Sequence, residues 1–169
     1  MASYYDTITS EQAALIAAAP LFFVASADPS LEAGPHGIGP VNLSPKGGVP
    51  LHIISPTRVA YLDYKGSGNE TARHLGAGGP VTLMVCSFAA EDAAIVRLYG
   101  RARVVPLEKS PLAELLLASP AADLRLPLRQ VVDVAVERTA TSCGYGVPVL
   151  APVRERTVGD RGRRYKEPR

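Results

Sequence analysis

The sequence predicts a mostly β protein, an antiparallel barrel with a few short helices at its periphery. Short apolar or alternating segments typical of strands outnumber helical segments. Many of them follow one another with only turn residues between them, and the 169 residues include 15 Gly and 15 Pro without a regular period. Successive strands without intervening helices favour antiparallel pairing over a doubly wound parallel sheet.

The first third of the chain supplies a helix and four strands. Thr9 followed by Gln12 matches a capping box, so we expect a helix that begins after Thr9 and ends at Pro20. A β-prone apolar segment follows at residues 21–27, and residues 28–40, with three Gly and three Pro, form a loop. Three more short strands, separated by turn residues, are expected at residues 41–44, 51–54 and 58–63.

The remaining elements alternate between short helices and longer strands. We expect helices at residues 70–75 and 111–117, a strand buried on both faces at residues 81–88, and alternating strands at residues 95–105 and 130–140. The total is six or seven strands and about three helices, with no internal repeat. One domain is therefore expected over residues 1–150, followed by a basic tail at residues 151–169.

Composition excludes several classes of protein. No segment approaches the ~20 apolar residues of a membrane helix, and the N-terminus lacks the pattern of a signal peptide, so we expect a cytoplasmic protein without a membrane partner. Cys86 and Cys143 form neither a disulfide framework nor a zinc motif, and no metal site is expected. The net charge is +2, and the basic tail has one Tyr and no recognition motif, so nucleic acid is not an expected partner.

The segment most informative about function is a glycine-rich loop between a strand and a helix. Gly66 and Gly68 allow backbone N–H groups to approach an anion, and Ser67, Asn69 and Thr71 carry side chains that donate to phosphate oxygens. The same residues also fit an ordinary loop in which Asn69 caps the helix. The local pattern leaves both interpretations open.

Two cationic positions have similar alternatives. Lys46 directly follows a strand, where it fits either a ligand-binding cation or a solvated turn lysine. Arg97, Tyr99 and Arg101 alternate onto one face of a strand, which fits an anionic ligand or a hydrated outer face equally well. No Ser/His/Asp or Cys/His arrangement supports nucleophilic catalysis, so the catalytic residues are unknown.

The order of these motifs resembles a known family. The chain contains, in sequence, Phe22-Phe23-Val24-Ala25, Val41-Asn42-Leu43-Ser44-Pro45-Lys46-Gly47, Val59-Ala60-Tyr61-Leu62-Asp63, Gly66-Ser67-Gly68-Asn69-Glu70-Thr71 and Arg97-Leu98-Tyr99-Gly100. This order is similar to that of the pyridoxamine 5′-phosphate oxidase-related flavin-binding split-barrel proteins. A late segment, Ser142-Cys143-Gly144-Tyr145-Gly146-Val147-Pro148, is similar to an uncharacterised bacterial branch of that family.

The resemblance implies a six-stranded antiparallel split barrel of Greek-key type and a homodimer that binds two FMN molecules between its subunits. It also implies the cofactor-binding positions. Those that it places near FMN are Val41, Asn42, Ser44, Lys46, Leu62, Asp63, Ser67, Asn69, Thr71 and Arg97.

The resemblance implies a relative of the vitamin-forming oxidases rather than one of them. Residues 66–71 contain no Arg or Lys, and the chain has no Trp, whereas the true oxidases have a basic phosphate loop and a C-terminal Trp and Arg signature. Three functions remain open: an FMN-dependent oxidoreductase for a small molecule, a non-catalytic flavin or haem binding or sensing protein, and a barrel that has lost its cofactor and serves as an interaction module.

Overall fold

Antiparallel strands form the body of the protein. The computed structural model describes residues 1–66, 68–118, 127–154 and 156. Within these ranges the strands are β1 (Ser3–Tyr5), β2 (Leu21–Ala27), β3 (Val41–Gly47), β4 (His52–Ser55), β5 (Arg58–Tyr64), β6 (Val81–Cys86), β7 (Ala94–Pro106) and β8 (Leu128–Cys143). The helices are α1 (Ser10–Ala18), α2 (Glu70–Gly76) and α3 (Ala113–Leu117), with short 3-10 turns at Pro35–Gly37 and Leu107–Lys109.

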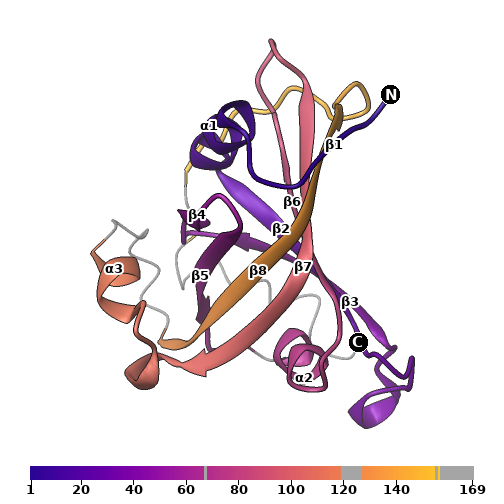
Figure 1. Ribbon diagram of the computed structural model, residues 1–169, viewed down its shortest axis with the longest axis vertical. Helices are drawn as coiled ribbons and strands as arrows, with labels where there is room; N and C mark the ends of the chain where they lie inside the picture. The colour runs from indigo at the N-terminus through magenta and orange to yellow at the C-terminus, as the bar shows by residue number, and fades with distance from the viewer. Residues whose placement is uncertain (67, 119–126, 155, 157–169) are drawn as a thin grey trace, which may run out of the picture.

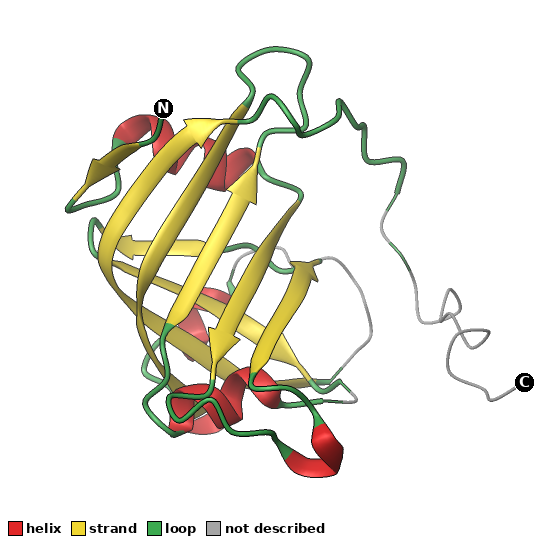
Figure 2. Ribbon diagram, turned by 90° about the vertical axis from the view of Figure 1, so that its right-hand side faces the viewer, coloured by secondary structure: helices red, strands yellow, loops and turns green. Residues whose placement is uncertain are grey.

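The strands belong to one antiparallel sheet in the order β3-β2-β6-β7-β8-β5-β4, and β1 pairs with the far end of β8. The sheet is strongly curved, and helices lie at its two ends (Figure 2). Its two sides meet where Nζ of Lys46 in β3 lies 2.6 Å from Oδ1 of Asp63 in β5. This curvature confirms the predicted fold class, a mostly antiparallel barrel with peripheral helices.

Alternation along the strands builds the core. In β2 the buried side chains are Phe22, Val24 and Ser26, and in β8 the valines at 132, 134 and 136 point the same way. Tyr61 of β5 is fully buried and packs edge-on against Phe22 with ring centroids 5.1 Å apart. Full burial of a large apolar side chain contributes about 1.5–3 kcal/mol, so this interior is the main source of stability.

The helices cover the open parts of the sheet. At α1 the Thr9 side chain accepts from the Gln12 backbone and the Gln12 side chain accepts from the Thr9 backbone, which confirms the predicted capping box. Ile16 of α1 enters the core. On the outer face of β5 and β8, Leu116 of α3 packs with a second apolar cluster that includes Leu62.

The structure extends several predicted strands and adds one. β3 continues through Pro45 to Gly47. Among the described residues β3 pairs only with β2, and a proline on an edge strand interrupts no ladder on its free side. β8 is 16 residues long and crosses the molecule beside β7 (Figure 1). β1 was not predicted, because three residues are too short to show a pattern.

Candidate functional site

A cluster of polar side chains gathers where β3, β5 and β8 meet the beginning of α2. Its members, which we call the Asp63 cluster, are Asn42, Ser44, Lys46, Asp63, Asn69, Thr71, Arg129 and Gln130. Alternation in β3 turns its three polar side chains to the same side, while Val41, Leu43 and Pro45 face solvent. Pairing of β5 with β8 places Asp63 directly opposite Gln130.

The Asp63 carboxylate is the centre of the cluster. One oxygen accepts from Lys46 Nζ at 2.6 Å, and the other accepts from Arg129 Nη2 and Gln130 Nε2, both at 2.8 Å. Burial raises the pKa of Asp63, but the hydrogen bonds from Lys46 and Arg129 outweigh that effect, and the pKa lies below its ordinary value. Asp63 is therefore ionised at neutral pH and neutralises one of the two cations beside it.

A second set of hydrogen bonds orients the hydroxyl groups. Asn42 Nδ2 donates to Ser44 Oγ and to Thr71 Oγ1, each at 3.0 Å. Because both hydroxyl oxygens already accept, their own protons remain available to donate. Gln130 Nε2 also donates to Asn69 Oδ1 at 3.1 Å. Asn69 occupies the N-cap position of α2, but its side chain makes no capping hydrogen bond there.

The cluster holds more donors than its own acceptors use. The buried Nε–H of Arg129 has no hydrogen-bond partner among the described residues. Lys46 has three N–H donors, and among the described residues its ion pair with Asp63 uses one of them. Two cations and one carboxylate give this group a net charge of +1 at neutral pH. The unused donors and the positive charge suit an anion such as phosphate, whose oxygens are strong hydrogen-bond acceptors.

A hollow beside the cluster provides space for the rest of a ligand. It has a volume of about 420 Å³ and is lined by Asn69, Glu70 and Arg73 on one side and by His36 on the other. Arg73 Nη1 donates to Asp28 Oδ2 at 2.8 Å, which holds the loop after β2 against α2. The loop therefore forms a defined wall of the hollow.

The structure brings together six of the ten sequence-predicted binding residues: Asn42, Ser44, Lys46, Asp63, Asn69 and Thr71. Val41 is on the opposite, exposed face of β3, and Leu62 is 1% exposed within the second apolar cluster, so neither side chain belongs to the Asp63 cluster. Arg97 donates to Ser142 Oγ at 3.0 Å, away from the cluster. Ser67 lies outside the described residues, as does most of the predicted basic tail.

Arg129 and Gln130 are the members that the sequence analysis missed. They stand at the beginning of β8, just before its alternating valines. A polar pair at a strand end is common in sequences, and only the register of β5 against β8 shows that it faces Asp63. Pairing information between distant strands would have been needed to find them.

Two other features are absent from the part of the chain that the structure describes. It contains no group of three or more His, Cys, Asp or Glu side chains arranged to hold a metal ion. None of its helices has the length and apolar character that crossing a membrane requires.

Comparison with known proteins connects the chain to one family. The family model described as pyridoxamine 5′-phosphate oxidase matches residues 8–143. A pyridoxamine 5′-phosphate oxidase family protein of Aspergillus flavus, ustO, is 33% identical over 153 residues, which cover 89% of this chain and 57% of that protein. The chain thus spans little more than half the length of this curated relative.

Two solved structures share the fold. A Lactobacillus delbrueckii protein, provisionally named a pyridoxamine 5′-phosphate oxidase, has a TM-score of 0.56 at 23% identity, over 80% of this chain and 94% of that one. An FMN-binding protein of Syntrophomonas wolfei has a TM-score of 0.55 at 12% identity, over 88% of this chain and 86% of that one. At these identities the likeness shows the split-barrel fold alone.

Proposed function

Since the chain belongs to the pyridoxamine 5′-phosphate oxidase family, we propose that it binds FMN and acts as a flavin-dependent oxidoreductase on a small molecule. The observation that carries the proposal is the Asp63 cluster, which presents two cations and unused N–H and O–H donors at one place. Residues 66–71 contain none of the Arg or Lys that make the phosphate loop of the true vitamin-forming oxidases basic, so the substrate is expected to differ from pyridoxamine 5′-phosphate.

The donors of the Asp63 cluster fit the phosphate of FMN. Lys46 and Arg129 would balance its charge, and the hydroxyl groups of Ser44 and Thr71 would each donate one hydrogen bond. The buried Nε–H of Arg129, which has no described partner, would gain a phosphate oxygen. When bound, FMN supplies the exchange of a hydride or electrons with the substrate, while the chain holds and orients it.

Asp63 has a separate role in this proposal. Its carboxylate lies between the Lys46 and Arg129 cations and reduces their mutual repulsion before the ligand arrives. The site is then preorganised without FMN, with each cation held within reach of the same region. Preorganisation reduces the entropy lost on binding.

We propose further that the protein is a homodimer in which Arg97 of the partner subunit completes the site. Within one chain, Arg97 pairs with Ala140, whereas the cluster contains Gln130 at the other end of β8. Ten strand residues span roughly 33 Å, far more than an arginine side chain can reach. In a dimer, Arg97 of the partner subunit could contact the flavin, which Arg97 of the same chain cannot reach.

The decisive experiment compares FMN with riboflavin, which lacks the phosphate. Fluorescence titration of the purified protein should give an affinity for FMN at least tenfold higher than for riboflavin, and Lys46→Met should remove most of that difference. Equal affinities for the two compounds would contradict the phosphate site. The absorbance spectrum of the purified protein adds a check, because a single intense haem band in place of the two flavin bands would contradict FMN as the ligand.

A mixing experiment tests the dimer. Lys46→Met and Arg97→Gln homodimers should each bind FMN weakly, whereas dimers formed by co-refolding the two variants should regain one intact site of two. Failure of the mixture to regain binding would place Arg97 outside the site, and a monomer of ~18 kDa in sedimentation would exclude the dimer itself.

A further inference from the structure

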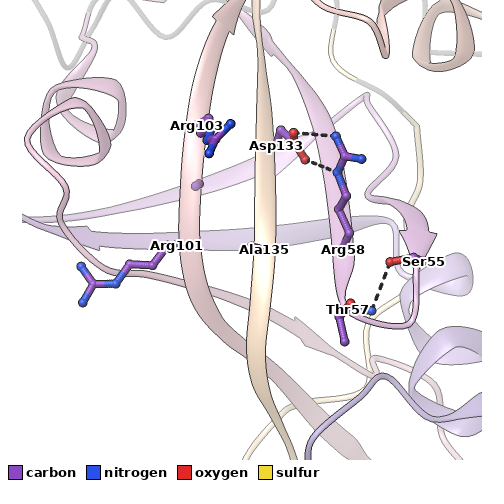
Figure 3. Close-up of a pocket in the computed structure, with 8 residues that line it drawn as sticks. Ser55, Thr57, Arg58, Arg101, Arg103, Asp133 and Ala135 are labelled. Atoms are coloured by element: carbon purple, nitrogen blue, oxygen red, sulfur yellow. Dashed lines mark hydrogen bonds and ion pairs between the residues drawn. The ribbon is translucent and has the colours of Figure 1, made fainter.

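The outer face of the sheet carries a second hollow, separate from the Asp63 cluster. It has a volume of about 540 Å³ and lies across β5, β8 and β7, where Arg58, Arg101, Arg103 and Asp133 line it. Figure 3 shows these side chains projecting from three neighbouring strands. In β5, Arg58 shares the outward side with Leu62, whereas Asp63 belongs to the other side of the strand. The two sites therefore stand on opposite faces of the sheet.

Arginine dominates the charge of this hollow. Arg58 donates from Nε and Nη2 to the two oxygens of Asp133, both at 2.8 Å, which fixes the guanidinium in one orientation. Arg101 Nη1 donates to the Gly78 carbonyl at 2.5 Å, and its Nε lies 3.9 Å from Glu137. Arg103 makes no hydrogen bond or ion pair with any residue in the described ranges, and it is exposed.

The base of the hollow is kept open by a small side chain. Ala135 of β8 lies between the strands that carry Arg58 and Arg101 (Figure 3), whereas Ala102 turns its side chain to the core and lines the hollow only with its backbone. A larger residue at 135 would fill the space between the arginines. Ala135 is therefore bordered by the strands that carry the arginines, and guanidinium binds carboxylate and phosphate through paired, parallel hydrogen bonds.

We propose that this hollow is a binding site for a small molecule that carries two or more carboxylate or phosphate groups. Arg103 supplies the free guanidinium, and Arg58, already oriented by Asp133, supplies the N–H groups that Asp133 leaves unused. The site does not depend on the proposed flavin binding, because it shares no residue with the Asp63 cluster.

The test is isothermal titration with two probes, pyrophosphate for phosphate and citrate for carboxylate, at constant ionic strength. Titrations are made with wild type and with Lys46→Met, so that binding at the Asp63 cluster is recognised separately.

The variants test the residues of the hollow. Arg103→Gln should lower the affinity for the probe that binds by about tenfold. Asp133→Asn should strengthen binding several-fold, because it removes a negative charge and one of the two oxygens that accept from Arg58. Arg138→Gln is the control, since Arg138 is a β8 arginine that stacks on Tyr4 outside the hollow.

The outcomes separate the alternatives. Opposite effects of Arg103→Gln and Asp133→Asn, retained in the Lys46→Met background and absent from Arg138→Gln, support the proposal, and the probe that binds identifies the chemical group. No saturable binding, or binding lost only with Lys46→Met, would overturn it. A shift of the sedimentation coefficient by Arg103→Gln with unchanged probe binding would also overturn it, because the face would then be a contact with a second copy.

Discussion

Lys46 and Asp63 form a 2.6 Å ion pair across the opening of the barrel, although β2, β6, β7 and β8 separate their strands in the sheet order. The same contact joins two sides of the sheet and orients the cation that is proposed to hold phosphate. One carboxylate therefore contributes both to stability and to the proposed binding site. Substitutions here should change stability and ligand binding together, and experiments must measure both.

The ionisation of Asp63 predicts how stability depends on pH. Burial alone would raise its pKa, but donors from Lys46 and Arg129 lower it below the ordinary value. The unfolded chain therefore takes up this proton first as pH falls, so the stabilisation is complete above the unfolded pKa of about 3.9 and is lost as pH drops through the lower folded pKa. Urea denaturation from pH 7 downward should show this loss below about pH 4 in the wild type.

The Asp63→Asn variant provides the comparison. At pH 7 it should lower the free energy of unfolding by about 1–3 kcal/mol, less than for a fully buried pair because Lys46 and Arg129 are partly exposed. Below pH 4 its stability should converge on that of the wild type. Parallel curves for the two proteins over the whole range would show that Asp63 contributes nothing to the acid transition.

Thr71→Ala should weaken FMN binding by about ten- to a hundredfold, because it removes one donor to a charged acceptor. It also removes the acceptor that orients Asn42. Thr82→Ala is a matched control on β6, and its affinity should remain that of the wild type. Unchanged FMN titration curves for Thr71→Ala would place the phosphate elsewhere.

Lys46→Met keeps the length of the side chain and removes its charge. A cation near the flavin stabilises negative charge on the reduced ring, so the variant should hold FMN at a lower reduction potential as well as more weakly. The exposed Lys109 provides a control, because Lys109→Met should change neither quantity. A titration that shows both the wild-type potential and the wild-type affinity for FMN in Lys46→Met would remove this lysine from the site.

Gly100 is required where β7 and β8 approach each other at a β-bulge. A Cβ at this position would come within 3 Å of the Ala135 carbonyl oxygen, which is backbone and cannot rotate away. Gly100→Ala should therefore cost about 1–3 kcal/mol of stability. Gly76→Ala, with open space around its Cβ, should be neutral or slightly stabilising. Equal melting temperatures for both variants would contradict the close approach.

Local patterns in the sequence predicted most of the fold and one side of the site. The alternation at residues 41–44 predicted a shared face for Asn42 and Ser44, and the loop before α2 supplied Asn69 and Thr71, whereas Lys46 was expected after the strand and lies within it. Such signals lie within a few residues of one another.

Features that depend on distant pairing could not be predicted in this way. Arg129 and Gln130 enter the site through the register of β5 against β8, which no local pattern encodes. The role of Arg97 and Arg101 was ambiguous for a related reason, because a strand's alternation does not show which residues its neighbours place beside it. The pairing of β1 with β8 is likewise a contact between the two ends of the domain.

The central position of β8 has a consequence for the newly made chain. β8 pairs with β1, β5 and β7, and without it the sheet would separate into β3-β2-β6-β7 and the hairpin β4-β5. During synthesis, the hairpin cannot pair with the remaining strands until residues 128–143 have left the ribosome. Until then, one edge of β7 stays unpaired. We therefore expect slow folding, limited by long-range pairing, and a dependence on chaperones that a barrel with sequential hairpins would not have.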